Sequence, residues 1–185
     1  MYSHLYINCG GEETFKYQDD TLKKTSYYNA AGKWAFSSTG NFLDGDHRTD
    51  IYVLSNTSNL QNISKDLKLY TKARTASISL TYYGLCLMNG NYTVRLHFAE
   101  IIFTDDSPGK RVFDVYVQGV LEEKDFDIVK EAGGTGIALI RSYIIDVKNN
   151  TLKVQLYWAG KGTTKIPYYG SYGPIISAIS VDPSK

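Results

Sequence analysis

The side chains best suited to a chemical task in this sequence are aromatic, and several fall in or beside segments whose patterns predict loops. The set comprises Trp34, Phe36, Tyr70, Tyr82, Tyr83, Phe103, Tyr168, Tyr169 and Tyr172. Sugars present flat apolar C–H faces ringed by hydroxyl groups, so a sugar site combines aromatic platforms with charged acceptors and donors. Arg74, Asp105 and Asp106 are candidates for the charged part. The alternative for each ring is packing in the core or at an edge of the fold.

Catalytic, metal and nucleotide chemistry finds little support in the sequence. Adjacent acids occur at Asp105–Asp106 and Glu122–Glu123, but glycoside hydrolysis needs two carboxylates that converge across a cleft, and neighbouring loop acids are usually solvated. The three histidines are scattered, and no zinc or EF-hand motif occurs, although a loop-bound calcium ion stays open. Gly160–Thr164 resembles a phosphate loop, but Gln155 stands where that motif needs its first glycine. We therefore expect no catalytic residue, no metal site and no cofactor.

Charge and hydropathy argue against two classes of partner. The 185 residues carry a formal net charge of +1, with basic and acidic residues mixed along the chain, so neither a nucleic acid nor an anionic membrane surface is an expected partner. No apolar run approaches the roughly 20 residues that span a bilayer, which predicts no membrane insertion by this segment. The first residues lack the features of a signal peptide. If the protein is secreted, we expect this chain to be a piece of a longer one.

Almost every segment with a clear period alternates between apolar and polar residues, as β-strands do. The alternating segments are Tyr92–Ile101, Val112–Gln118, Leu152–Trp158 and Ile175–Val181. Turn residues separate them, above all Asn89-Gly90, a strong hairpin signal, and Asn149-Asn150. Only Val120–Glu131 and Ser64–Arg74 leave room for a short helical turn. The pattern predicts a single all-β domain over residues 1–185, an antiparallel β-sandwich.

Glycosylation sequons and a pair of cysteines are consistent with the secretory pathway. The sequons begin at Asn56, Asn62, Asn91 and Asn149, which are the candidate N-glycosylation sites. This is more than chance supplies for a chain of this composition. In that oxidising compartment Cys9 and Cys86 are expected to form a disulfide. The alternative is two buried, reduced thiols.

Short segments along the chain resemble successive blocks of a plant malectin domain. They are Ile7–Gly11, Trp34–Gly40, Tyr82–Leu87, Asn89–Ile101, Gly109–Gly119, Asp125–Ile128, Tyr157–Thr163 and Tyr172–Pro183. The resemblance runs in order from about Leu5 to Pro183 and is greatest to the malectin unit of leucine-rich-repeat receptor-like serine/threonine kinases. It implies a jelly-roll-like sandwich related to carbohydrate-binding modules, and a place at the extracellular face of the plasma membrane in a single-pass receptor. It also supports the Cys9–Cys86 bridge.

The residues that hold the sugar in animal malectin, an endoplasmic-reticulum lectin for glucosylated N-glycans, carry over poorly to this chain. The matching positions are Thr75, the Ile102-Phe103 pair and Gly170, so only Phe103 keeps its aromatic character. Each lost stack or charged hydrogen bond costs about 1–3 kcal/mol, whereas micromolar binding amounts to about 8 kcal/mol in total. The animal specificity is therefore not expected here.

Two functional hypotheses follow from the sequence. In the first, the domain binds a glycan of the cell wall, or another glycan, through loops at one end of the sandwich. The candidate site residues are Trp34, Phe36, Tyr70, Arg74, Thr75, Ile102, Phe103, Asp105, Tyr168, Tyr169 and Tyr172. In the second, the domain binds no sugar and is a protein-interaction or spacer module that contacts leucine-rich repeats, a co-receptor or a peptide. Its 16 tyrosines suit this role equally well.

Overall fold

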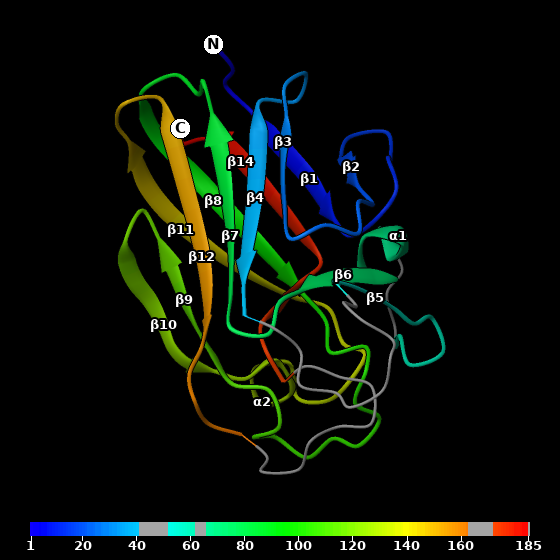
Figure 1. Cartoon of the computed structure of the whole chain (residues 1–185). Helices are drawn as coiled ribbons and strands as arrows, with labels where there is room; N and C mark the ends of the chain where they lie inside the picture. Colours follow the sequence, from blue (N-terminus) through cyan, green and yellow to red (C-terminus); the bar gives the residue numbers. More distant parts are fainter. Residues whose placement is uncertain (41–51, 62–65, 163–171, 185) are drawn as a thin grey trace.

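The computed structural model describes residues 1–40, 52–61, 66–162 and 172–184. In this part of the chain two larger sheets lie face to face, and a short third sheet accompanies them (Figure 1). The five-stranded sheet has the order β11 (Leu139–Val147), β8 (Gly90–Phe98), β14 (Ala178–Pro183), β1 (Leu5–Cys9) and β2 (Gln18–Asp20). The six-stranded sheet has the order β10 (Val120–Phe126), β9 (Phe113–Val117), β12 (Thr151–Trp158), β7 (Ser79–Leu85), β4 (Trp34–Thr39) and β3 (Ser26–Asn29). The third has the order β13 (Ile175–Ile176), β6 (Lys72–Thr75) and β5 (Val53–Ser55).

Alternating burial confirms the all-β sandwich that the sequence predicts. The inward side chains of β8 are Tyr92, Val94, Leu96 and Phe98, and those of β12 are Leu152, Val154 and Leu156. Phe98 contacts Phe113 of β9 and Phe126 of β10, with ring centroids 5.9 and 5.0 Å apart. Because Phe98 belongs to the five-stranded sheet and the other two rings to the six-stranded sheet, this cluster joins the two layers.

The two helices of the described residues are single turns. Helix α1 (Leu67–Tyr70) lies inside Ser64–Arg74, one of the two segments that the sequence leaves open to a helical turn. Helix α2 (Ile128–Ala132) begins inside the other, Val120–Glu131, and ends one residue beyond it. The first part of Val120–Glu131 is instead strand β10, which forms a hairpin with β9. Asp127 caps α2, since its carboxylate accepts hydrogen bonds from the backbone nitrogens of Val129 and Lys130. Across the described ranges, no helix is long and apolar enough to cross a membrane.

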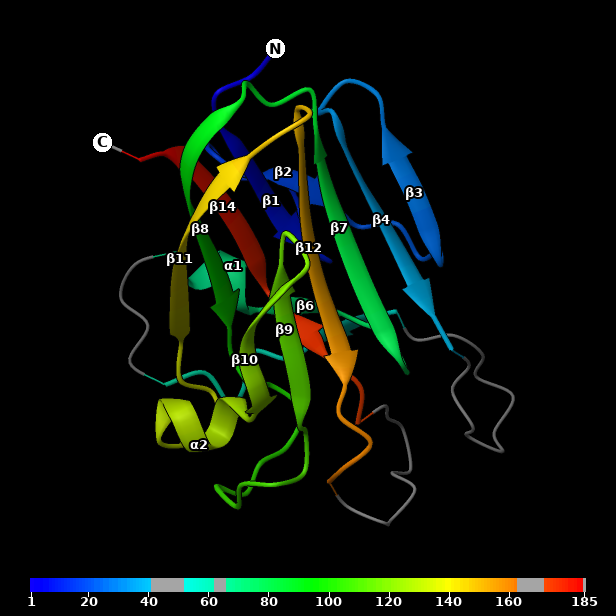
Figure 2. The same cartoon turned by 90° about the vertical axis from the view of Figure 1, so that its left-hand side faces the viewer.

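The sandwich has two distinct ends. Both chain termini lie toward one of them, together with the β7–β8 and β11–β12 turns, and we call it the terminal end (Figure 1). Helix α2 and the loop that follows β8 lie at the opposite end, the helix end (Figure 2). Asn149 and Asn150 form the β11–β12 turn with φ angles of 56° and 57°, in the left-handed region that asparagine tolerates. The Asn150 side chain donates to the carbonyl oxygen of Leu87 at 2.7 Å, which ties the two turns together.

The two cysteines do not form the expected disulfide, and both are free thiols. Cys9 is fully buried at the last position of β1, where burial raises the pKa of its thiol. Cys86 is exposed in the β7–β8 turn, and its carbonyl oxygen accepts a hydrogen bond of 2.9 Å from the backbone nitrogen of Tyr2. The segment from Tyr2 to Cys9 spans about 20 Å when extended, whereas a disulfide needs Cα atoms within about 7 Å. Strand β1 therefore holds the two thiols far apart.

Candidate functional site

Five residues of the predicted binding mouth belong to the core instead. Trp34, Phe36, Tyr70, Arg74 and Thr75 each expose 4% or less of their surface. Trp34 and Phe36 occupy alternate positions of β4, and this alternation turns both rings into the sandwich. The Arg74 guanidinium lies 3.9 Å from the centroid of the Phe36 ring. These side chains therefore do not line an open mouth.

Arg74 owes its burial to an acid far away in the sequence. Its Nε donates to Oδ2 of Asp20 at 2.6 Å and its Nη2 to Oδ1 at 2.8 Å, a bidentate pair. The same Nη2 donates to the carbonyl oxygens of Asp20 and Leu22, at 2.9 and 2.8 Å. The Tyr82 hydroxyl donates to the Asp20 carboxylate, and burial raises the pKa of Tyr82 well above its usual value. With these partners the pair fastens β2 to β6 inside the protein.

Tyr70 and Thr75 also serve internal contacts. The Tyr70 hydroxyl and His97 Nδ1 share a hydrogen bond of 2.9 Å, and His97 Nε2 shares one of 3.1 Å with the Ser180 hydroxyl. Burial lowers the pKa of His97 to about 4, so its ring is neutral at ordinary pH. The Thr75 hydroxyl donates to the carbonyl oxygen of Pro174 at 3.1 Å. Tyr70 thus joins α1 to β8 of the five-stranded sheet, and Thr75 joins β6 to the residue before β13.

The remaining described candidates come together at the helix end. Phe103 and Tyr172 stack with ring centroids 5.5 Å apart and an interplanar angle of 19°, and both are partly exposed. Lys110 Nζ lies 5.5 Å from the Phe103 centroid and pairs with Asp105 at 2.5 Å. We call Phe103, Asp105, Lys110 and Tyr172 the Phe103 cluster. Ile102, half-buried, precedes it and packs against the core. The predicted Tyr168 and Tyr169 lie outside the described residues.

A buried ion pair positions this cluster, and sequence reasoning missed it. Arg111 Nε donates to Glu100 Oε2 at 2.7 Å, and Glu100 Oε1 accepts from the backbone nitrogens of Ile102 and Phe103 at 3.0 and 3.3 Å. Arg111 Nη1 donates to the carbonyl oxygen of Gly173 at 2.6 Å, beside Tyr172. One ion pair thus holds the backbone next to both rings. A signal was available, because this acid and this arginine flank the loop between two predicted strands.

The acids of the same loop are poorly suited to hydrolysis. Asp106 Oδ1 accepts hydrogen bonds from the backbone nitrogen and the hydroxyl of Thr135, at 2.7 and 3.0 Å, and these bonds lower the pKa of Asp106. A general acid of a glycosidase needs a raised pKa instead. The Asp105 carboxylate forms an ion pair with Lys110. Among the described residues no group of His, Cys, Asp and Glu side chains is arranged to hold a metal ion.

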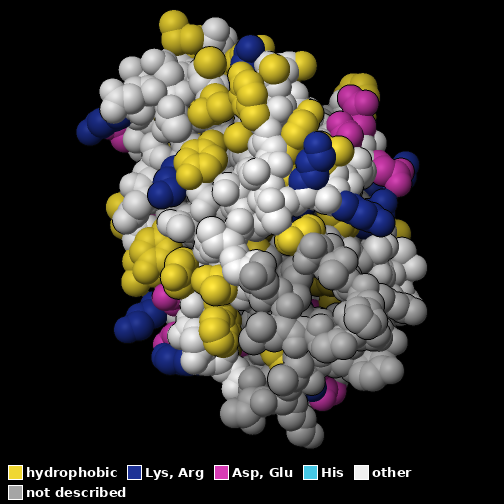
Figure 3. Space-filling view, in the orientation of Figure 1, with side chains coloured by type: hydrophobic (Ala, Val, Ile, Leu, Met, Phe, Trp, Pro, Cys, Tyr) yellow, Lys and Arg dark blue, Asp and Glu magenta, His cyan; other side chains and the backbone are white. Residues whose placement is uncertain are grey.

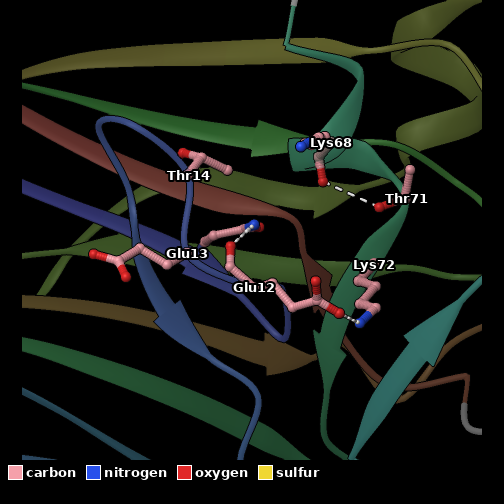
Figure 4. A pocket seen from close by; sticks show the side chains of 7 residues that line it. Glu12, Glu13, Thr14, Lys68, Thr71 and Lys72 are labelled. Carbon is pink, nitrogen blue, oxygen red and sulfur yellow. Dashed lines mark hydrogen bonds and ion pairs between the residues drawn. The ribbon is translucent and has the colours of Figure 1, made fainter.

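A recess lined by polar and charged residues lies beside β1 and α1 (Figure 4). Its volume is about 170 Å³, and its lining residues are Asn8, Glu12, Glu13, Thr14, Lys68, Thr71 and Lys72. Glu12 and Lys72 point toward one another and form an ion pair of 3.0 Å, while Glu13 points away from them (Figure 4). The recess offers hydrogen bonds to a small polar group. It has no ring on which a sugar could stack.

Tyrosines also mark the outer face of the six-stranded sheet. The strand register places Tyr28 opposite Ala35, Ala35 opposite Tyr83 and Tyr83 opposite Lys153, in one row across β3, β4, β7 and β12. Tyr116 and Tyr157 project from the same face of β9 and β12, and Tyr28 and Tyr157 expose 54% and 46% of their surface. We call Tyr28, Tyr83, Tyr116 and Tyr157 the tyrosine face. Figure 3 shows hydrophobic side chains spread over this side of the molecule.

Comparison with known proteins assigns the family. The model of the malectin domain family matches residues 3–179. Two probable LRR receptor-like serine/threonine-protein kinases of Arabidopsis thaliana are 54% and 50% identical over 97% of this chain. The chain spans about a fifth of the length of these relatives, 19% of each.

Solved structures share the fold at low sequence identity. The extracellular domain of ANXUR1 from Arabidopsis thaliana superposes with a TM-score of 0.65 at 18% identity, over 96% of this chain and 47% of that chain. A Bacteroides uniformis beta-glucuronidase 2 superposes with a TM-score of 0.64 at 16% identity, over 98% of this chain and 18% of that chain. At such identities the likeness is one of fold alone. From the family match and the close plant relatives, the chain belongs to the malectin domain family.

Proposed function

We propose that this malectin domain is the extracellular recognition module of a plant receptor-like kinase, and that it binds a carbohydrate through the Phe103 cluster. Its relatives carry the receptor-like kinase name, which supports both the plasma-membrane location and a kinase elsewhere in the complete protein. The domain itself contributes recognition and no catalysis. The observation that carries the carbohydrate proposal is the stacked, partly exposed Phe103–Tyr172 pair, set beside a lysine and an aspartate.

The chemistry of this cluster suits a sugar ring. The Phe103 and Tyr172 rings offer an apolar surface to the C–H face of a pyranose, and the Lys110–Asp105 pair offers a donor and acceptors to its hydroxyl groups. Glu100 and Arg111 hold the loop backbone in place before the ligand arrives, so little ordering cost is left for binding. Such a site discriminates by shape and hydroxyl orientation more than by charge.

An array of cell-wall oligosaccharides followed by isothermal titration tests this proposal. We expect Phe103→Ala to weaken binding about tenfold, the equivalent of a lost stacking contact of about 1.4 kcal/mol. Tyr28→Ala is the matched control, since it removes an exposed ring from the tyrosine face. The proposal would be contradicted if the folded protein bound no oligosaccharide of the array, or if the Phe103→Ala variant bound as tightly as the unchanged protein.

The tyrosine face favours a second candidate function, a protein interface. Tyrosine gives large contact area at little entropic cost, and four such residues share one sheet face with exposed positions among them. A co-receptor ectodomain or the adjoining leucine-rich repeats would pack on this face without any sugar.

Two engineered glycans separate the two functions. Asp105→Asn with Ser107→Thr creates a sequon at the Phe103 cluster, and Ser37→Asn creates one on the outer face of β4, before Ser38 and Thr39. The controls Asp105→Gln with Ser107→Thr, and Ser37→Gln, lack the added sequon and therefore the added glycan. With occupancy verified by mass spectrometry, loss of sugar binding only with the first glycan supports the carbohydrate site. Loss of protein binding only with the second supports the interface.

A further inference from the structure

The sequons of this chain differ in what their asparagine side chains already do. Asn91 and Asn149 are exposed, and neither side chain has a hydrogen-bond partner among the described residues. Asn56 is only partly exposed. Its Nδ2 donates to the carbonyl oxygen of Ile101 at 2.9 Å, and its Oδ1 accepts from the backbone nitrogen and the hydroxyl of Ser58, at 3.0 and 2.6 Å. The amide of Asn56 is therefore engaged on both sides.

We propose that Asn91 and Asn149 carry N-linked glycans and that Asn56 does not. The proposal rests on the secretory placement in the proposed function, but it is independent of what the domain binds. Asn62 lies outside the described residues and forms no part of it. A glycan is bulky and strongly hydrated, so the folded chain accepts it only where the amide nitrogen faces solvent.

The covalent step balances with a donor of the secretory pathway, an oligosaccharide linked to a lipid diphosphate. The amide Nδ2 forms a bond to the anomeric carbon of the first sugar. The bond between that carbon and the diphosphate oxygen breaks, the lipid diphosphate leaves with the bonding electron pair, and the amide releases one proton to the solvent. No electron transfer takes place. The hydroxyls of Thr93 and Thr151 complete the two motifs.

Both proposed glycans lie at the terminal end. Gly90 pairs with Val147 and Asn91 with Asp146 in the β8–β11 ladder, so Asn91 lies near the turn that contains Asn149. Figures 1 and 2 both place the start of β8 and the β11–β12 turn at the end where the termini lie. The Asn150–Leu87 hydrogen bond fixes this turn. The glycans therefore project from a rigid edge, away from the Phe103 cluster.

Asn56 differs from Asn91 and Asn149, because its amide nitrogen already binds the protein backbone. The carbonyl oxygen that it binds belongs to buried Ile101, which directly precedes the loop of the Phe103 cluster. A glycan on this nitrogen would press against the backbone of residues 101–103. Glycosylation there would disturb the loop that Glu100 and Arg111 hold in place.

Glycopeptide mass spectrometry on the complete protein that contains this chain, purified from plant cells, tests the proposal. Enzymatic glycan removal in heavy-oxygen water marks each occupied asparagine. We expect occupancy above about half at Asn91 and Asn149 and below about a tenth at Asn56. Asn149→Gln and Asn91→Gln should each remove one glycan step on a denaturing gel, whereas Asn56→Gln should leave the mobility unchanged.

The possible failures are distinct. Occupied Asn56, or bare Asn91 and Asn149 in a protein whose other sequons are glycosylated, overturns this inference and leaves the extracellular location standing. A protein with no glycan at any sequon overturns the inference together with the proposed location.

Discussion

Two buried ion pairs of the same kind lie in different parts of this molecule. Arg74–Asp20 and Arg111–Glu100 have nitrogen–oxygen distances of 2.6 and 2.7 Å, and each of these side chains exposes 2% or less of its surface. Each guanidinium also faces a phenylalanine ring, Phe36 at 3.9 Å and Phe103 at 5.0 Å from the ring centroid. By composition the two arrangements are nearly identical.

The two ion pairs differ in the groups to which their other hydrogen bonds are made. Asp20 is bonded by the Tyr82 hydroxyl and belongs to a strand, so the first pair closes the core over Phe36. Glu100 accepts from the backbone of a loop, and Arg111 donates to the backbone beside Tyr172, so the second pair fixes a surface with Phe103 upon it. The same charged device thus completes a core in one place and presents a ring to solvent in the other.

Arg74→Met removes the ion pair of the core, Arg74–Asp20. We expect a loss of about 3–5 kcal/mol in the free energy of unfolding, because the buried Asp20 carboxylate is left without its cation. Urea unfolding measures it. Lys110→Met, which breaks the more exposed Lys110–Asp105 pair, should cost less than about 1 kcal/mol. Equal losses in the two variants would mean that the Arg74 pair contributes no more than a surface contact.

His97 contrasts with the two buried arginines, because it is buried without a charged partner in direct contact. Its pKa of about 4 in the folded state lies below about 6.5 in the unfolded state. The unfolded state therefore binds the proton more readily between these values, and the stability that neutral His97 provides is complete above about pH 6.5 and lost as the pH falls to about 4. The loss amounts to about 3 kcal/mol.

Unfolding midpoints across this pH range measure the effect of His97. His97→Gln should flatten the acid limb of the stability profile, whereas the control His4→Gln, at an exposed position, should preserve it. A profile unchanged by the His97 substitution would show that other groups cause the acid sensitivity. Asp66, Arg95 and Lys16 act on the charge of His97 from neighbouring elements.

Arg111→Lys tests the surface side of the comparison. Lysine keeps the positive charge but cannot hold Glu100 and the carbonyl of Gly173 with a planar fork, so we expect a loss of about 2 kcal/mol in unfolding free energy. Ligand binding should fall as well, because the Phe103 and Tyr172 loops lose their common anchor. Arg95→Lys, in a half-exposed pair with Asp182, is the control for both measurements.

Phe103→Ala should have the smallest effect on stability, less than about 1 kcal/mol, because its ring is already partly exposed. Phe36→Ala, the same change over the other ion pair, should cost about 3–5 kcal/mol. Thermal unfolding of the two variants side by side checks the difference. Similar costs would mean that the Phe103 ring belongs to the core after all.

The strands were predictable because their evidence is local. From Tyr92 to Phe98, apolar and polar residues alternate in the sequence and burial alternates in the structure, so a period of two residues was sufficient to predict this strand. The same rule applied to Trp34 and Phe36 would have turned both inward, since they alternate with Ala35 and Ser37. Treating them as loop residues of a binding mouth overlooked that pattern.

Long-range contacts explain the other misses. Arg74 is buried because it pairs with Asp20, 54 positions earlier and on a strand of another sheet, and no local pattern in the sequence predicts that contact. The separation of the two thiols likewise depends on the fold, because Cys9 lies at the last position of β1, whereas Cys86 lies beside Tyr2, before that strand begins. The sequence predicted Phe103 in or beside a loop, and its role in binding stays a prediction. Its support by Glu100 and Arg111 could be seen only in the fold.

The place of β14 has a consequence for how the protein is made. This strand lies between β8 and β1, with Val181 opposite both Val94 and Leu5, although it comes last in the described chain. During translation β1 must therefore wait, unpaired on this side, until the ribosome has passed Pro183. A nascent chain that stops earlier keeps two open strand edges facing each other, which are templates for aggregation.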